Sequence, residues 1–273
     1  MPMFNRRTVL VGSGMALANG SLTLARSAEP PRTGSMPSSD VLPSFPSTDP
    51  DLVGAVVLHA HSDLDRVVEL VTAHPHLARA SVDWGFGDWE SALGAASHMG
   101  RRDIADFLID TGARPNIFSA AILGQLGVVK ALVEASPGVQ RIPGPHGITL
   151  LAHARFGGEA AEPVVEYLEG LGDADLRPET IDMTDQQRQQ FIGTYDFNAS
   201  SNNSVEITER RGILTITRSG REFGSRMYPV SDTEFGLSAS PSVRIAFEIE
   251  DSKATAVRII DNQVLLTANR VNG

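Results

Sequence analysis

The segment from Asp83 to Asn116 constrains the fold of this chain more than any other segment. It contains, in order, a glycine-rich turn, a short apolar helical pattern, a break at Gly100, an amphipathic helical pattern and a stop at Gly112. Because glycine adopts positive φ without strain, Gly100 allows a tight connection between two helices, and Gly112 supplies the left-handed residue that ends the second. The segment therefore predicts a turn followed by a pair of helices.

The same pattern recurs along the chain. Gly100 and Gly124 are each preceded by an alanine four residues earlier and followed by apolar residues four and five positions later. Helical hydrophobic spacing extends from about residue 51 to residue 176, after which strand alternation begins. Self-similarity of this kind is typical of repeat proteins. We therefore expect four helix pairs, at residues 51–80, 89–112, 117–135 and 149–170.

The segment 83–116 resembles one ankyrin repeat, and the stretch from Gly147 to Ala154 resembles the ankyrin signature G-x-T-P-L-H-x-A. Gly100 and Gly124 are separated by 24 residues, which is less than the ankyrin period of about 33, so the resemblance implies a third unit without its hairpin turn. A single ankyrin unit cannot bury its apolar face alone. The resemblance therefore implies an α-solenoid of about four stacked units at residues 51–177.

Residues 191–273 show the alternation of antiparallel strands. Two alternating stretches flank Arg210-Arg211-Gly212, which predicts a hairpin. We expect six to eight short strands that form a small open barrel or curled sheet. Phe191-x-Gly193-x-Tyr195 and related patterns resemble the lipocalin-like domain appended to serine β-lactamase and esterase-type proteins. The expected fold class is α+β with two domains, an α-solenoid followed by a small antiparallel β-barrel-like domain.

Residues 1–27 have the layout of an export signal. Arg6 and Arg7 precede a weakly apolar run, as in twin-arginine signals, and Ala25 and Ser27 stand where signal peptidase prefers small residues. An ordinary Sec signal and an uncleaved anchor are the alternatives. We expect a periplasmic or secreted monomer with no other membrane span. Its linkers are a Pro/Ser-rich stretch and a short connection before the β domain, at residues 28–50 and 178–190.

Composition excludes several classes of function. The formal net charge of −10 disfavours nucleic acid, which binds basic surfaces. The absence of cysteine excludes disulfides and cysteine-ligated metal sites. No Gly-x-Ser-x-Gly motif, no lysine three residues after a serine and no phosphate-binding glycine loop occurs. We therefore expect no enzyme activity and no cofactor.

Histidines close in sequence raise the question of a metal site. His59 and His61 lie near Asp63, and His74 lies near His76. Residues at i and i+2 of a helix point to different sides, so His59 and His61 do not easily share one ion. We therefore expect no metal site.

Aromatic and basic residues gather around the turn of the second unit. In an ankyrin stack such turns project along the concave edge where partners dock, and exposed aromatic side chains there serve as anchors. The predicted function is a non-catalytic interaction with a protein or peptide partner. The predicted contact residues are Trp84, Phe86, Trp89, His98, Arg101 and Arg102.

Two alternatives remain open at this stage. In the first, the β domain would bind a small apolar ligand and the ankyrin-like helices would be its scaffold. In the second, the chain would be an accessory subunit of a neighbouring hydrolase. In the first case four aromatic residues would line the ligand site. If the barrel binds no ligand, the same residues would form its core. These are Phe191, Tyr195, Phe235 and Phe247.

Overall fold

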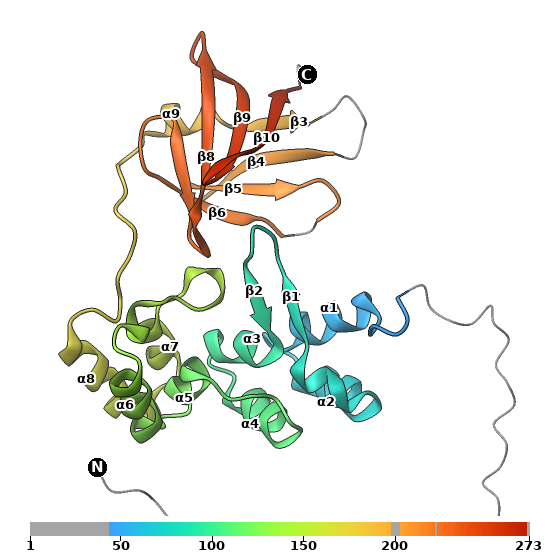
Figure 1. Ribbon diagram of the computed structural model, residues 1–273, viewed down its shortest axis with the longest axis vertical. Coiled ribbons are helices and arrows are strands. Elements are labelled where there is room, and N and C mark those ends of the chain that lie inside the picture. The colour runs from blue at the N-terminus through green and yellow to red at the C-terminus, as the bar shows by residue number, and fades with distance from the viewer. Residues whose placement is uncertain (1–43, 198–202, 222, 272–273) are drawn as a thin grey trace, which may run out of the picture. The chain divides into compact units, whose positions relative to one another are not determined.

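The computed structural model describes residues 44–197, 203–221 and 223–271. A helical region is followed by an eight-stranded, antiparallel, closed β-barrel (Figure 1). The predicted export signal at 1–27 and most of the first predicted linker lie outside the described residues. Among the helices that the structure describes, none has both the length and the apolar character needed to cross a membrane.

Eight α-helices of the described region form four consecutive pairs. The pairs are α1 (Pro50–His59) with α2 (Leu64–Ala73), α3 (Ala92–His98) with α4 (Arg102–Asp110), α5 (Ile117–Ile122) with α6 (Leu126–Ala135), and α7 (Leu150–Phe156) with α8 (Glu162–Leu171). The first helices of successive pairs contact one another, α1 with α3, α3 with α5, and α5 with α7. The four predicted helix pairs are therefore confirmed.

Shorter helical segments complete this region. A ninth α-helix precedes the barrel, and 3₁₀ turns connect or flank the longer helices. These are α9 (Asp185–Gln189), η2 (Pro75–Arg79), η3 (Val139–Arg141), η4 (Pro145–Gly147) and η5 (Glu159–Ala161). The second helix pair begins at Ala92 rather than at Trp89, because residues 89–91 form a strand.

Local chemistry explains where the helices begin and turn. The side chain of Ser91 accepts a hydrogen bond from the backbone N–H of Gly94, and Asn116 forms a capping box with Ser119. Such caps satisfy N–H groups that have no partner within the helix. Gly100 has a φ of 67°, and a Cβ at this position would collide with the carbonyl oxygen of Phe156. Glycine is therefore required at this connection both for its conformation and for space.

A two-stranded hairpin connects the first helix pair to the second. It consists of β1 (Ser81–Asp83) and β2 (Trp89–Ser91), with Val82 opposite Glu90. Gly85 and Gly87 have positive φ in the connecting turn, as expected for a glycine-rich hairpin. This hairpin supplies several residues of the site described below.

The barrel contains all the remaining described strands, in the order β10-β3-β4-β5-β6-β7-β8-β9. Their bounds are β3 (Gly193–Asp196), β4 (Ser204–Arg210), β5 (Ile213–Arg218), β6 (Ser225–Pro229), β7 (Glu234–Leu237), β8 (Ser240–Glu250), β9 (Lys253–Asp261) and β10 (Gln263–Arg270). The predicted hairpin is confirmed, since Arg211 and Gly212 form the turn between β4 and β5 with positive φ. The expectation of an open barrel or curled sheet is corrected, because β10 pairs with β3 and closes the barrel.

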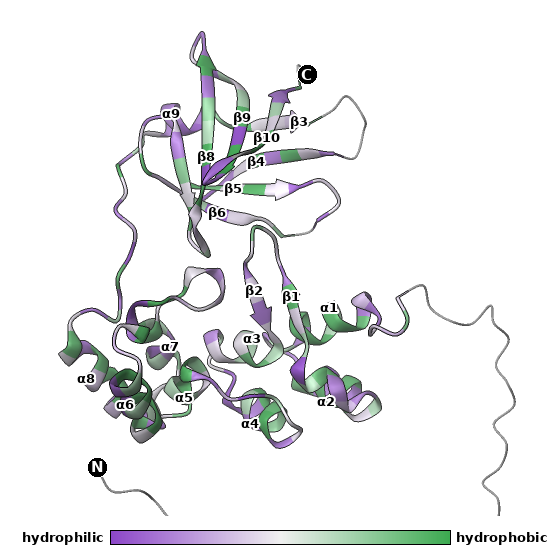
Figure 2. Ribbon diagram, viewed as in Figure 1, coloured by the Kyte–Doolittle hydropathy of each residue, from purple (hydrophilic) through white to green (hydrophobic). Residues whose placement is uncertain are grey.

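Apolar residues alternate with polar ones along the longest strand, β8 (Figure 2). Val243, Ile245 and Phe247 are buried, Arg244 is half-buried and Glu248 is exposed, whereas Ala246 interrupts the alternation as a second buried apolar residue. Alternate residues of a strand point to opposite faces, so one face of β8 forms the interior of the barrel. The barrel thus has its own apolar core, separate from those of the helices.

Candidate metal centre

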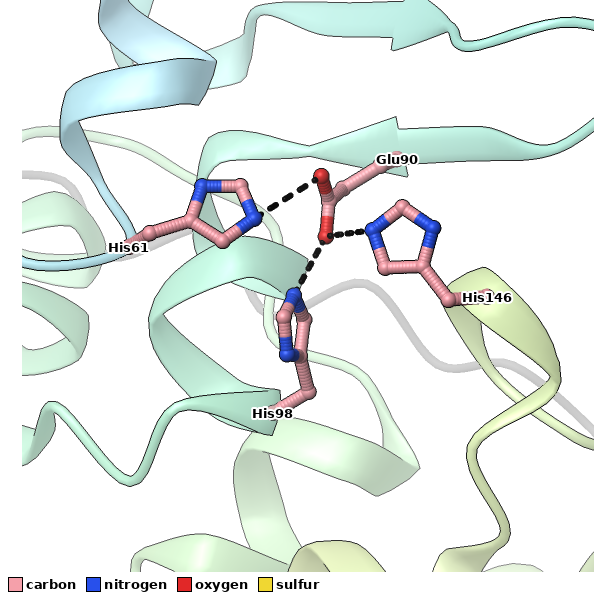
Figure 3. Close-up of side chains that lie close together, drawn as sticks. All are labelled: His61, Glu90, His98 and His146. Carbon is pink, nitrogen blue, oxygen red and sulfur yellow. Dashed lines mark hydrogen bonds and ion pairs between the residues drawn. The ribbon is translucent and has the colours of Figure 1, made fainter. Parts of the chain in front are cut away.

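Four polar side chains converge within the helical region. His61, Glu90, His98 and His146 each offer one ligand atom, and these atoms all lie within 4.8 Å of one another (Figure 3). The residues come from four separate segments, namely the turn after α1, strand β2, the last residue of α3, and η4. The fold therefore brings together residues that are up to 85 positions apart in the sequence.

Glu90 lies at the centre of this cluster and is fully buried, with 0% of its surface exposed. Its neighbour Trp89 is 64% exposed, because successive side chains of strand β2 point to opposite faces. Two donors hold the Glu90 carboxylate. The indole N–H of Trp84 donates to Oε2 over 2.7 Å, and Nε2 of His98 lies 2.8 Å from Oε1.

His61 is oriented by the end of helix α1. Its Nδ1 lies 3.1 Å and 3.0 Å from the carbonyl oxygens of Val57 and Leu58, so Nδ1 carries the proton and donates to them. These carbonyls belong to the last turn of the helix, where backbone acceptors lack helical partners. In the neutral ring, Nε2 is then free to act as a ligand atom, and it lies 3.5 Å from Oε2 of Glu90.

His146 is oriented by the buried Asp88. The Asp88 carboxylate accepts from Nδ1 of His146 over 2.7 Å and from the backbone N–H of His146 over 2.9 Å. His146 has a φ of 59°, a left-handed conformation that is uncommon for residues other than glycine. The two bonds to Asp88 hold this conformation and direct Nε2 toward Glu90, whose Oε1 lies 3.3 Å away.

The pKa values of the central groups are strongly shifted. Burial alone would raise the pKa of Glu90, but hydrogen bonds from His146 and His98 and the charges of His146 and His61 outweigh it and lower the pKa to about 2. Burial would lower the pKa of His146, but Asp88 and Glu90 together raise it to about 10. Without a metal ion, the cluster therefore holds an ionised Glu90 beside a protonated His146.

The distances in the cluster suit a first-row divalent metal ion. Such an ion bonds imidazole nitrogen at about 2.0–2.1 Å and carboxylate oxygen at about 2.0–2.2 Å, so neighbouring ligand atoms of a tetrahedral site lie roughly 3.4 Å apart. Nε2 of His98 and Nε2 of His146 lie 2.8 and 3.3 Å from Oε1 of Glu90, and Nε2 of His61 lies 3.5 Å from Oε2. The four ligand atoms together lie within 4.8 Å of one another, so binding of an ion would draw them closer. Imidazole and carboxylate together suit zinc, iron and manganese rather than a soft ion.

The cluster is accessible from one side. The side chains of Glu90 and His98 are 0% and 7% exposed, whereas those of His61 and His146 are 23% and 31% exposed. His61 and His146 also line a pocket of about 400 Å³, which has Leu58 and Trp84 in its wall. An ion between the four side chains would therefore face this pocket.

The predicted partner-contact residues have different positions. His98 lies within the cluster, and Trp84 is bonded to Glu90 at its edge. Phe86 packs against the barrel core, and its carbonyl accepts a hydrogen bond from Ser240. Trp89 is the aromatic residue of the set with a largely exposed side chain.

The two arginines predicted to contact a partner make their side-chain contacts within the helical region. Arg101 pairs with Asp103 and donates to the carbonyl of Ser62. Arg102 donates to the carbonyls at the end of α5, those of Ile122 and Leu123. Their role in partner binding stays a prediction.

The four aromatic residues of the alternative ligand site lie in the core of the barrel. Phe191, Tyr195, Phe235 and Phe247 are buried, and their rings contact one another with centroids 4.8–5.7 Å apart. The hydroxyl of Tyr195 donates to the carbonyl of Phe191 over 2.6 Å. These residues therefore contribute to the packing of the barrel interior.

Sequence reasoning did not find His61, Glu90 and His146 as a group. It correctly separated the two close histidines, since His59 faces Asp63 whereas His61 faces Glu90. A usable signal was present in the sequence alignment of the first two helix pairs. Aligning Val67 with Ile104 places His61 on His98, 37 residues later, and the two rings lie 4.9 Å apart.

No protein-family model matches this chain, and no curated protein matches it in sequence. Any functional assignment therefore depends on the geometry of the side chains.

Proposed function

We propose that the protein binds a divalent transition-metal ion, with zinc as the first candidate, through His61, Glu90, His98 and His146. The observation that carries the proposal is the arrangement of three imidazole rings around one fully buried carboxylate. Histidine is the commonest metal ligand, and the buried glutamate completes a set of four ligand atoms.

The groups behind the ligands support a metal site over a simple ion pair. The Nδ1 atom of His61 is bonded to backbone carbonyls, and that of His146 is bonded to Asp88. Metal-binding histidines are usually fixed in this way, because the second ring nitrogen donates to a carbonyl or carboxylate. A simple ion pair would need only one cationic side chain beside Glu90, whereas three histidine rings lie around this carboxylate.

The helix pairs are proposed to be ankyrin-like units that serve as the scaffold of this centre. Support comes from the contacts between first helices of successive pairs and from the equivalent glycines Gly100 and Gly124, both of which have positive φ. In such a stack, equivalent positions of neighbouring units lie side by side. This explains how His61 and His98 meet.

The export of the protein and the lipocalin-like character of its barrel also stand as proposals. The paired arginines Arg6 and Arg7 and the small residues Ala25 and Ser27 support export to the periplasm or beyond. The eight-stranded closed barrel is compatible with a lipocalin-like domain.

Metal binding is tested by titrating the metal-free protein with Zn²⁺ against a chromophoric chelator, and with Co²⁺ by visible absorption. The His98→Ala and His146→Gln variants should lose at least tenfold in affinity. His59→Gln is the matched control, because His59 lies two residues from His61 but faces Asp63. The proposal fails if wild-type protein binds Zn²⁺ no more tightly than a His61→Gln/His146→Gln double variant.

Binding of a protein or peptide partner, without catalysis, is the second candidate function. The exposed Trp89 favours it, since this side chain borders a groove of about 370 Å³. Residues from the following units also line this groove, among them Asn116, Phe118 and Pro143. Quantitative capture from a periplasmic extract with wild-type and Trp89→Ser protein tests this function. A partner retained equally by both proteins would count against Trp89 as an anchor.

A further inference from the structure

We infer that the pocket beside the cluster is a binding site for a small aromatic anion whose charged head completes the coordination of the metal ion. This inference rests on the proposed metal binding and adds the class of ligand. The pocket has a volume of about 400 Å³, within the range of small-molecule sites. Its lining includes His61 and His146, so it reaches the accessible side of the cluster.

The wall of the pocket is suited to a planar ring. Leu58, Trp84 and Phe223 supply apolar surface, and the rings of Trp84 and Phe223 meet edge to face with centroids 5.6 Å apart. The indole N–H of Trp84 donates to Glu90, which fixes the orientation of that ring. A ligand ring packed on this wall contacts an aromatic surface that is already held in place.

The polar lining favours a negatively charged head. Arg226 lines the pocket, is exposed, and makes no ion pair within the described part of the chain. A metal ion between His61 and His146 would add positive charge on the same pocket. The buried Asp88 also belongs to the lining, but both of its carboxylate oxygens are occupied by His146. An oxygen anion that binds the ion therefore meets a favourable electrostatic environment.

The ligand class follows from these three features. The space accommodates a ring with a short head group, the wall favours an aromatic body, and the ion and Arg226 favour an anionic oxygen donor. Aromatic carboxylates and related chelating anions have this chemistry. The barrel interior is not required for binding, because its aromatic residues pack against one another.

Two hydroxamates test the inference, because they share a metal-binding head and differ in the ring. Benzohydroxamate carries a phenyl ring, whereas acetohydroxamate carries a methyl group. Their affinities are measured by calorimetry with Zn²⁺-loaded wild-type protein, and Zn²⁺ affinity is measured on the same samples. We expect benzohydroxamate to bind about tenfold more tightly, as is typical for the burial of an additional ring, and neither compound to bind the metal-free protein.

Variants of the wall separate the pocket from the metal centre. Leu58→Trp, which fills the pocket, and Phe223→Ala, which removes part of the wall, should abolish the advantage of benzohydroxamate without changing Zn²⁺ affinity. Unchanged Zn²⁺ affinity also serves as the control for folding. Arg226→Gln should weaken both hydroxamates by a similar factor.

The outcomes distinguish the two proposals. Equal affinities of the two hydroxamates for loaded wild-type protein, or an undiminished advantage in Leu58→Trp, would overturn the aromatic pocket while metal binding stands. Absence of Zn²⁺ binding in the first titration would overturn both.

Discussion

The stability of the metal-free protein should fall as the pH rises above neutrality, because His146 must then lose its proton. The pKa of His146 is raised from 6.5 to about 10 by Asp88 and Glu90, against the opposing effect of burial. A group whose folded pKa is raised stabilises the protein fully below its unfolded pKa and loses that contribution as the pH rises through the folded pKa. The sensitive window for His146 therefore extends from about pH 6.5 to pH 10.

The magnitude follows from these two pKa values. At about 1.36 kcal/mol per pH unit, the contribution lost between pH 6.5 and pH 9 is roughly 3 kcal/mol. The His146 side chain is 31% exposed, and solvent screening reduces this to roughly 2 kcal/mol. The low pKa of Glu90 reflects the same contact, so its energy is counted once. For a protein of this size, the melting temperature should fall by roughly 4–8 °C.

Thermal unfolding at several pH values, with and without bound Zn²⁺, measures this effect. The metal-free wild-type protein should lose stability from pH 6.5 to pH 9. The His146→Gln variant, which has no proton to lose at this position, should show a flatter profile. The Zn²⁺-loaded protein should also be less sensitive, because the ion supplies the positive charge. Equal losses in wild-type and His146→Gln protein would refute the reasoning.

Three further predictions concern neighbouring residues. Asp88→Asn should weaken Zn²⁺ binding about 10- to 100-fold in a chelator competition assay, because Asp88 orients a ligand without touching the ion. Gly100→Ala should lower the free energy of unfolding in urea by roughly 2 kcal/mol or more, because residue 100 has a φ of 67° and the added Cβ would collide with Phe156. Gly54→Ala is the control: a Cβ at this position of α1 meets open space, so this variant should be more stable by about 0.5–1 kcal/mol. The pKa of the buried His153 is lowered to about 4, chiefly by burial. The contribution of the neutral His153 side chain to stability is therefore fully present above pH 6.5 and is lost as the pH falls through 4. Between pH 7 and pH 4.5, the free energy of unfolding in urea should fall by roughly 2–3 kcal/mol more in the wild-type protein than in the His153→Phe variant.

Elements with strong local signals could be predicted from the sequence. The third helix pair has the predicted bounds, Ile117 to Ala135, because an asparagine cap begins it and its hydrophobic spacing continues to the end. The turn between β4 and β5 was also predictable, because Gly212 accepts positive φ next to two alternating strands. In both cases a few adjacent residues determine the structure.

Long-range features could not be predicted in the same way. Closure of the barrel depends on the pairing of Arg270 with Tyr195, and no periodic pattern identifies which strands meet across so many residues. The cluster posed the same difficulty. Burial of Glu90 depends on a three-residue strand at positions that were predicted to begin a helix, and the position of His146 depends on a left-handed conformation held by Asp88. Only the equivalent positions of His61 and His98 in the first two helix pairs, 37 residues apart, could be found from the sequence.

The hairpin of β1 and β2 connects the two candidate functions. Strand β2 directs Glu90 into the cluster and Trp89 to the outside, because adjacent side chains of a strand point to opposite faces. The same three residues therefore form both faces of strand β2. The outer face was predicted to contact a partner, and the inner face would bind the proposed ion. Substitution of Glu90 by glutamine changes the inner face alone, and substitution of Trp89 by serine changes the outer face alone. If metal binding and partner binding respond independently to these two changes, the hairpin carries two separate sites. If loss of Glu90 also weakens the partner, the ion orders the strand that presents Trp89, and the two binding events are linked.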